Sequence, residues 1–528
     1  MTTFLSQGID YLGFLEAKLR DLQGEATLAY ELIQNADDAK ASRIVFDVRD
    51  EALVVENTSL FSDCAQVEAD ECHWKALYGY RCDFHRFRKV AGGDKRDQEE
   101  TTGAFGIGFI SVYQITDRPE LQSGRRHWII RPDEPEQQRI EVVPVSEHFE
   151  GTRFVLPWAI DPNTRLRQRL RTPTLSIPEA ADAFTAALAC NLPDAILFLK
   201  HVECIELRRR GELVKQIQRS SDGDQVVVQD GDSLHLWYIL RGSFDTEAQR
   251  LRGQYPHQIE QKRTAFVTVA IPEDISKRRG RFCACLPTEQ YTELPVYINA
   301  DFYPSTDRKR ILLTNDYQGQ WNRAAITEAA KLIASAVPSL TQKFDHNSLW
   351  EFFNQIKKVA DEAAAGHQDH VFRSFWQFTQ SSIENYPTVF IWPAGWKKPT
   401  EALLPEQSAK EDALNLWQAD KQPLASSTEA TLPEQSAKED ALNLWQAMGL
   451  SIVHPDLRPY FPLLRAVKVR VLSLADLVQA LKQAGLDKTV ALEQAPVWIR
   501  SRDARDALGC EIQRLSSQQV KSELLADA

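Results

Sequence analysis

The chain has 528 residues, of which 43% are hydrophobic and 26% are charged, and its formal net charge is −12. This length exceeds what one hydrophobic core usually organises, so we expect about three domains of ordinary globular composition. The acidic balance argues against attraction of the whole molecule to nucleic acid or to anionic lipid.

Localisation is predicted from what the sequence lacks. No apolar run approaches the roughly 18 residues that cross a bilayer, and the N-terminus does not resemble a signal peptide. The eight cysteines are sparse and show no disulfide-scaffold spacing. We therefore expect a cytoplasmic protein with no membrane partner.

The first predicted elements form an α/β unit (an α+β sandwich) over residues 1–160. Residues 4–41 are predicted to form two helices, because Gly24 interrupts their apolar pattern. Apolar segments at 43–48 and 52–55 predict two strands joined by a tight turn. Further strands are expected at 128–131, 140–145 and 152–156. Helices and strands mix without a strict βαβ order, which predicts this fold class.

The segment 62–100 is polar and carries two adjacent glycines near its end, which predicts a mobile segment over a site rather than core. Its metal-ligating residue types are Cys64, Cys72, His73, Cys82 and His85. The spacing Cys82-x-x-His85 is compatible with zinc, but no paired Cys-x-x-Cys knuckle is present. Free thiols and solvated imidazoles are therefore the favoured interpretation, with zinc as the alternative.

The remainder of the chain is predicted to contain two further regions. Prolines and arginines at 162–180 predict a linker, followed by a second α/β domain over 181–343. Its expected strands lie near 202–207, 226–229, 234–240, 265–271 and 296–299, with a closing helix at 321–337. Residues 344–528 are expected to be mainly helical. There, the segment 404–419 recurs letter for letter at 432–447. We expect one copy to pack and the other to be a tolerated insertion.

Glu31 and Asn35 are the most informative pair of polar residues. They lie four residues apart in the second predicted helix, and residues at this spacing share one helix face. An amide oxygen can hold Mg²⁺, and a carboxylate can orient and deprotonate an attacking water. Considered alone, the pair is equally consistent with the polar stripe of a surface helix.

A glycine-rich turn follows further along the chain. Gly103, Gly106 and Gly108 precede a predicted helix at 109–115. Glycines allow the backbone to approach a phosphate, and a helix N-terminus offers free N–H donors. Together with Glu31, Asn35 and a Gly-Thr pair at 151–152, this order predicts a nucleotide site.

These motifs resemble those of the GHKL ATPases, whose nucleotide site is the Bergerat fold. The resemblance rests on 31–39, the segment near 57–61, 103–121 and 151–154. It is closest to the branch that contains sacsin and the ninety-kilodalton heat-shock chaperones. It extends more loosely to 192–207 and 294–322. It implies an N-terminal Bergerat-fold ATP-binding domain at 1–160 and a transducer-like domain at 181–343.

The resemblance also implies roles for individual residues. Glu31 would be the general base, Asn35 the Mg²⁺ ligand, and Asp38 a hydrogen-bonding support. Thr152 would help hold the adenine-side water network, and Arg308 would reach the γ-phosphate or else be a surface arginine. The turn that binds the phosphates of ATP would comprise Gly103, Phe105, Gly106, Ile107, Gly108 and Phe109.

One position departs from the family pattern. The family usually places Asp where the adenine amino group binds, whereas this chain has Asn57 and Thr58. An asparagine oxygen still accepts a hydrogen bond but forgoes charge assistance worth about 1 kcal/mol. The sequence therefore specifies the residues that would bind phosphate and metal better than those that would bind adenine.

These features predict a conformational switch that binds Mg-ATP, hydrolyses it slowly, and forms a homodimer through its N-terminal domain. It would act on an unidentified client protein. The alternative is a non-hydrolysing nucleotide-binding scaffold or sensor for a partner protein. A third hypothesis, by analogy with similar sacsin-like proteins, places it in a bacterial defence system. Glu31, where histidine kinases of the superfamily typically have Asn, argues against a kinase.

Overall fold

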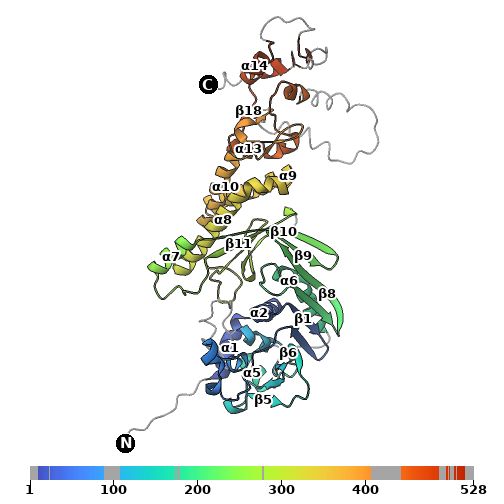
Figure 1. Ribbon diagram of the computed structural model, residues 1–528, viewed down its shortest axis with the longest axis vertical. Helices are drawn as coiled ribbons and strands as arrows, with labels where there is room; N and C mark the ends of the chain where they lie inside the picture. Colours follow the sequence, from blue (N-terminus) through green and yellow to red (C-terminus); the bar gives the residue numbers. More distant parts are fainter. Residues whose placement is uncertain are drawn as a thin grey trace. The chain divides into compact units, whose positions relative to one another are not determined.

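The computed structural model describes residues 10–88 except Gln23, then 108–172, 174, 179–275, 279–405 and 442–486, and short stretches between 495 and 517. The chain divides into two compact units, Met1–Ala329 and Ala330–Ala528 (Figure 1). We describe each unit by itself.

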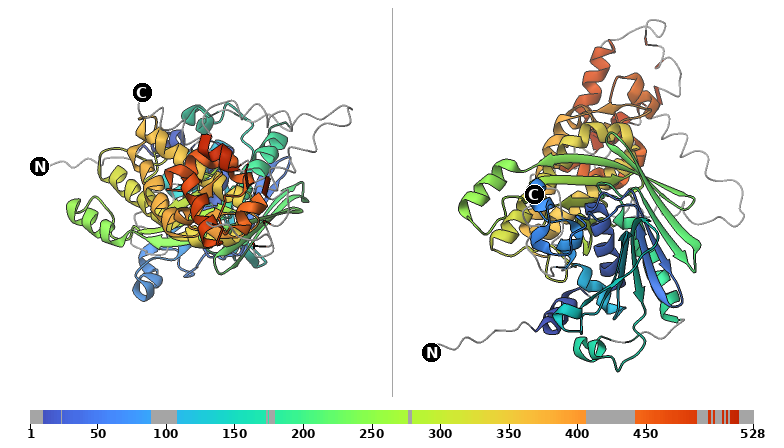
Figure 2. Two further views of the ribbon diagram at one scale, coloured as in Figure 1. Left: turned by 90° about the horizontal axis from the view of Figure 1, so that it is seen from above. Right: turned by 60° about the horizontal axis from the view of Figure 1, so that its bottom comes forward.

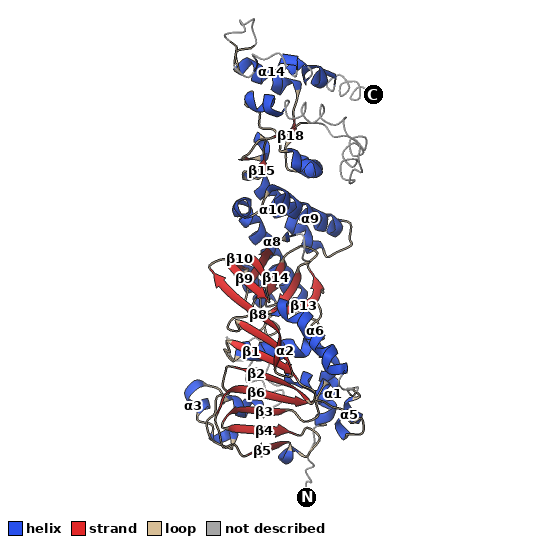
Figure 3. Cartoon of the chain, turned by 90° about the vertical axis from the view of Figure 1, so that its right-hand side faces the viewer, coloured by secondary structure: helices blue, strands red, loops and turns tan. Residues whose placement is uncertain are grey.

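The first unit is built on one mixed sheet of fourteen strands. One part of it has the strand order β1-β2-β6-β3-β4-β5. These strands are β1 (Arg43–Val48), β2 (Ala52–Asn57), β3 (Glu120–Gly124), β4 (Arg126–Ile130), β5 (Ile140–Val143) and β6 (Phe149–Pro157). Figure 3 shows them as successive rungs in this order.

The other part of the sheet continues in the order β7-β8-β9-β10-β11-β14-β12-β13. Its strands are β7 (Cys204–Arg209), β8 (Glu212–Asp222), β9 (Gln225–Asp230), β10 (Ser233–Ser243), β11 (Phe266–Pro272), β12 (Arg281–Ala284), β13 (Leu286–Tyr291) and β14 (Tyr297–Ala300). Strands β1 and β7 pair in parallel, with Arg43 opposite Cys204, and join the two parts (Figure 2). The predicted α/β class is confirmed, and one sheet spans residues from both predicted α/β domains.

Helices cover this sheet and supply the rest of its core. They include α1 (Tyr11–Asp21), α2 (Glu25–Asp38), η3 (Gly108–Gln114), α5 (Arg165–Leu170), α6 (Glu179–Ala195) and α7 (Asp245–Gln254). Helix α2 buries Leu28, Leu32 and Ile33 among the shared core residues. The predicted break between the first two helices is confirmed, because Gly24 caps α2 with a φ of 112°, which favours glycine.

The segment 62–88 corrects a prediction. The sequence predicted no core here, but the segment contains η1 (Ala69–Glu71), α3 (Trp74–Tyr78) and α4 (Asp83–Phe87), and it contributes buried side chains to the core. On α4, the Phe84 ring packs tilted against Phe61 and edge-on against Trp128, with ring centroids 5.3 and 4.9 Å apart. The polar composition misled the prediction because the few buried residues of this segment, such as Cys64, Cys82 and Phe84, are scattered among exposed ones. Residues 89–100 lie outside the described residues.

The predicted linker also contains ordered structure. Thr164 caps α5 by accepting a hydrogen bond from the Arg167 backbone. The Arg167 side chain is only 2% exposed and pairs with Asp117 at 2.5 Å. It also donates to the carbonyls of Tyr113 and Thr116 at 2.6 and 3.0 Å, and so fixes the chain that leaves η3. The arginines of this segment thus include a buried structural residue.

The second unit is mainly helical over its described residues. Helix α8 (Tyr317–Lys343) crosses the boundary between the units. It is followed by α9 (His346–Ala364), η6 (His370–Phe372), α10 (Arg373–Asn385), η7 (Pro399–Glu401), η9 (Pro455–Tyr460), α13 (Phe461–Ala466) and α14 (Leu474–Gln483). Two small sheets pair β15 (Val389–Phe390) with β16 (Trp396–Lys397), and β17 (Leu403–Leu404) with β18 (Arg470–Val471). The aromatic residues Trp350, Phe352 and Phe353 are fully buried and belong to the core of this unit.

The repeated segment is described only in part. In the second copy, Leu442, Leu444 and Trp445 are buried in the C-terminal core cluster. Nearly all of the first copy lies outside the described residues. Among the described residues, no helix has the length and apolar character that a membrane crossing demands.

Candidate functional site

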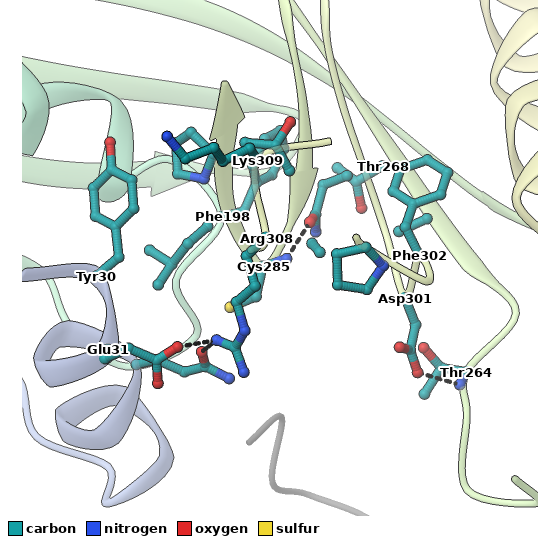
Figure 4. Close-up of a pocket in the computed structure, with 18 of the residues that line it drawn as sticks. Tyr30, Glu31, Phe198, Thr264, Thr268, Cys285, Asp301, Phe302, Arg308 and Lys309 are labelled. Atoms are coloured by element: carbon teal, nitrogen blue, oxygen red, sulfur yellow. Dashed lines mark hydrogen bonds and ion pairs between the residues drawn. The ribbon is translucent and has the colours of Figure 1, made fainter. Parts of the chain in front are cut away.

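Glu31 lies in the middle of α2, with its side chain facing the second part of the sheet. Its carboxylate is only 7% exposed and forms an ion pair with Arg308 (Figure 4). The same guanidinium lies 3.3 Å from Gln34 Oε1, one helical turn further along α2. An acid, an amide and a cation therefore meet at one point, contributed by segments 277 residues apart.

The loop that carries Arg308 is held by buried hydrogen bonds. Asn322, fully buried on α8, accepts from the Tyr303 backbone N–H and donates to the carbonyls of Tyr303 and Leu312, each at 2.8 Å. Arg308 itself has a φ of 56°, a left-handed conformation that costs energy in a non-glycine residue. Its backbone N–H donates to Ser305 O at 2.8 Å, which stabilises this turn. The cation is thus positioned by a defined loop.

Gly108 lies directly against the Glu31 carboxylate. A methyl group at this position would overlap Glu31 Oε2, so any larger residue would displace the carboxylate from its place. Gly108 opens η3, a 3₁₀ helix where an α-helix was expected at 109–115. Phe109 follows, with its ring 5.0 Å from Phe87 and 5.2 Å from Phe154. The other turn residues, Gly103, Phe105, Gly106 and Ile107, lie outside the described residues.

Asn57 and Thr152 form a second polar group. They are direct cross-strand partners on β2 and β6. Thr152 Oγ1 donates to Ser59 O at 2.7 Å and lies 2.9 Å from Ser123 Oγ, which accepts from the Phe61 N–H. Asn57 Oδ1 accepts from the Ser59 backbone N–H at 3.0 Å. The structure therefore brings these two predicted residues together, and the Ser123 hydroxyl joins the same polar group.

Asn35 and Asp38 lie on the last turns of α2, where both are half-buried. Their neighbour Asp37 is only 3% exposed. Its carboxylate accepts from the backbone N–H groups of three consecutive residues, Lys200 to Val202, at 2.7–3.0 Å. Asp37 thus ties α2 to the start of the second part of the sheet.

A cavity of about 590 Å³ opens beside Glu31 and Arg308, a volume typical of small-molecule sites. Its charged lining residues are Glu31, Lys200, Glu260, Lys262, Arg263, Asp301, Asp307, Arg308, Lys309 and Glu289. Burial raises the pKa of the Asp301 carboxyl, and the charge of Arg263 partly offsets this effect. Burial, together with the nearby Asp194 carboxylate, raises the pKa of Tyr30. The cavity lining thus carries equal numbers of acidic and basic side chains around Arg308.

Sequence reasoning missed Gln34 and Ser123. Gln34 lies three residues after Glu31 and so shares its helix face. This spacing in the sequence could have identified it. Ser123 is a lone serine on β3, and only the pairing of β3 with β6 places it beside Thr152. No local pattern identifies such a residue.

Comparisons with known proteins concern the N-terminal part of the chain. Residues 10–142 match the model of the Sacsin domain. "Sacsin" of Homo sapiens is 35% identical over 125 residues, which cover 22% of this chain and 3% of that protein. The chain thus matches only a small part of this relative. The matches confirm the sacsin-like part of the predicted resemblance for residues 10–142, a range that includes Glu31, Asn35 and Asn57 but not Arg308.

Among solved structures, similarity is found to "Crystal Structure of N terminal domain of a DNA repair protein". The sequence identity is 11% and the TM-score is 0.33, over 62% of this chain and 99% of that chain. A likeness of this size carries no conclusion about activity.

Proposed function

We propose that the chain is a sacsin-like conformational switch of the GHKL type that binds Mg-ATP at α2 and hydrolyses it slowly. One observation carries this proposal: the Glu31 carboxylate lies between Gly108, the last glycine of the turn, and Arg308 from a distant loop. Phosphoryl transfer to water needs a general base beside a phosphate-binding turn and a positioned cation, and this arrangement would supply both.

The residues present fit a magnesium ion and a triphosphate. Asn35 supplies a hard amide oxygen one turn from Glu31, which is the kind of ligand that Mg²⁺ prefers. When bound, Mg²⁺ neutralises phosphate charge and favours attack at the γ-phosphorus. Glu31 would orient a water and accept its proton. Arg308 would contact the γ-phosphate. This second anion would compete with Glu31 for the guanidinium, so that the Glu31 carboxylate becomes available to the attacking water.

Phosphate release by the full chain tests this proposal. We expect release that depends on Mg²⁺ and stops when EDTA removes it. Arg308→Ala should lower kcat by about 10²-fold, as loss of one preorganised charge donor typically does. Arg310→Ala is the matched control, because it removes the same charge from an exposed position two residues further along the chain. Equal turnover by the two variants would contradict the role of Arg308.

A second candidate function is favoured by two contacts. Arg308 already neutralises Glu31, and Asn57 Oδ1 already accepts a hydrogen bond from Ser59. Both contacts weaken the case for efficient turnover and favour a nucleotide-binding scaffold or sensor for a partner protein. ATP binding with no phosphate release at high protein concentration would support this alternative.

The same proposal includes the compartment and the oligomeric state of the protein. A cytoplasmic protein of this kind would form a homodimer through its N-terminal residues when ATP binds, and would act on a client protein. Sedimentation of the full chain with and without Mg-ATP tests the predicted change in mass.

A further inference from the structure

Three cysteines and one histidine converge in the segment that follows β2. Cys64, Cys72, Cys82 and His85, here called the Cys3His cluster, are all buried, and their ligand atoms lie within 4.8 Å of one another. No part of the proposed ATPase mechanism uses them. Four soft donor groups hidden from solvent at one point need a physical explanation.

The distances in the Cys3His cluster match the edges of a tetrahedron around one ion. Cys82 Sγ lies 3.6 Å from Cys64 Sγ. His85 Nδ1 lies 3.4 Å from Cys64 Sγ and 3.2 Å from Cys82 Sγ. With zinc bonds of about 2.3 Å to sulfur and 2.0 Å to nitrogen, tetrahedral edges are about 3.8 and 3.5 Å. The sulfur separation is far from the roughly 2.05 Å of a disulfide.

The histidine is oriented as a metal ligand. His85 Nε2 lies 3.2 Å from the Val67 carbonyl oxygen, which can only accept, so Nε2 carries the proton. In the neutral imidazole the lone pair therefore sits on Nδ1, which faces the sulfur atoms. Metal-bound histidines characteristically donate their other N–H to such a carbonyl. The Cys82 N–H also points to Cys72 Sγ, at 3.4 Å, which favours the thiolate form.

The helices around the Cys3His cluster are too short to be stable by themselves. They are η1, α3 and α4, which contain only three, five and five residues. Cys82 caps α4, His85 lies within it, and Cys72 caps η1. A cross-link at these positions would join both helices to the loop at Cys64.

Polar contacts already bring the loop at Cys64 to its place. Ser62 and Asp83 exchange reciprocal hydrogen bonds at 2.7–3.0 Å, which ties the loop to the start of α4. Arg126 on β4 holds the Asp63 carboxylate through two hydrogen bonds, at 2.6 and 2.7 Å. The donor set is therefore preorganised by neighbours that are not themselves ligands.

We propose that the Cys3His cluster holds one zinc ion, as a closed structural site beside the candidate nucleotide site. Three thiolates and an imidazole in a closed four-coordinate set are the ligands that structural zinc prefers. Phe84 and Phe87 on the same helix reach the aromatic group that includes Phe109, so the ion would stabilise the packing next to Gly108.

Metal analysis of the purified full chain tests the proposal. We expect about one zinc per chain for the wild type, and less than about a tenth of that for Cys82→Ser, because a site with three ligands binds far more weakly. Cys190→Ser is the matched control, since Cys190 is an exposed free cysteine on α6. Equal zinc content in the two variants, or a wild type that neither contains nor takes up zinc, would overturn the site.

A second measurement on the wild type covers the case in which Cys82→Ser fails to fold. Protein stripped by a chelator and titrated with Co²⁺ should show thiolate-to-cobalt charge transfer and the intense visible bands of tetrahedral cobalt, saturating at about one equivalent. Zn²⁺ should then abolish these bands. A weak octahedral spectrum, or a disulfide between Cys64 and Cys82 in protein purified under reducing conditions, would contradict the proposal.

Discussion

Replacing Glu31 by glutamine lowers kcat for ATP hydrolysis by about 10²–10⁴-fold, the usual contribution of a positioned general base. The substitution keeps the size of the side chain that fits against Gly108 but removes the group that accepts the proton of water. Binding of Mg-ATP should change little, because Asn35 and the backbone of the glycine turn are unaltered. Phosphate release under single-turnover conditions measures the effect.

The matched control is Glu25→Gln, an exposed acid in the first turn of the same helix. It removes the same charge from α2 without touching the Glu31–Arg308 pair, so we expect turnover close to that of the wild type. If Glu31→Gln hydrolyses ATP as fast as Glu25→Gln does, Glu31 is not the base.

Replacing Arg167 by alanine destabilises the first unit by about 3–5 kcal/mol, as expected when one partner of a buried ion pair is removed. Five acceptors lose a hydrogen bond from this guanidinium: the Asp117 carboxylate, the Thr172 hydroxyl and the carbonyls of Tyr113, Gln114 and Thr116. Burial lowers the pKa of Arg167 and the charge of Asp117 opposes this, so the guanidinium depends on its partner. Denaturant unfolding, followed by tryptophan fluorescence, measures the loss.

Arg169→Ala provides the comparison for Arg167, two residues along the chain. The Arg169 side chain is 45% exposed and pairs with Asp10 at the surface, where solvent screens the interaction. We expect a much smaller change in the unfolding midpoint. An equal loss of stability in both variants would mean that this segment is uniformly sensitive and that the buried contacts of Arg167 are not decisive.

Local patterns in the sequence predicted the parts of the site that local structure determines. Glu31 and Asn35 share a face of α2 because helical periodicity fixes it. Strand β1 was predicted with its observed bounds because its short, mostly apolar sequence is rich in β-branched and aromatic residues. Asn57 and Thr152, predicted separately, turned out to be cross-strand partners. Their roles in binding ATP stay predictions.

The remaining features depend on contacts between distant segments. The pair of Arg308 with Glu31 follows from the parallel pairing of β1 with β7 and from the loop that Asn322 holds, and neither leaves a local signal. The Cys3His cluster was disfavoured because its ligands are spaced irregularly, although tertiary packing brings them together. Strand β8 was not predicted, because its many exposed polar residues hide the alternation of a strand.

The central claim is that α2 carries an Mg-ATP site, and equilibrium binding of ATP to the full chain tests it most directly. Isothermal titration in Mg²⁺ should give a saturable single site for the wild type, and EDTA or the substitution Asn35→Ala should weaken it at least about tenfold through loss of the metal ligand. Wild-type protein that binds no ATP in Mg²⁺, or that binds it as tightly after Asn35→Ala, would contradict the account.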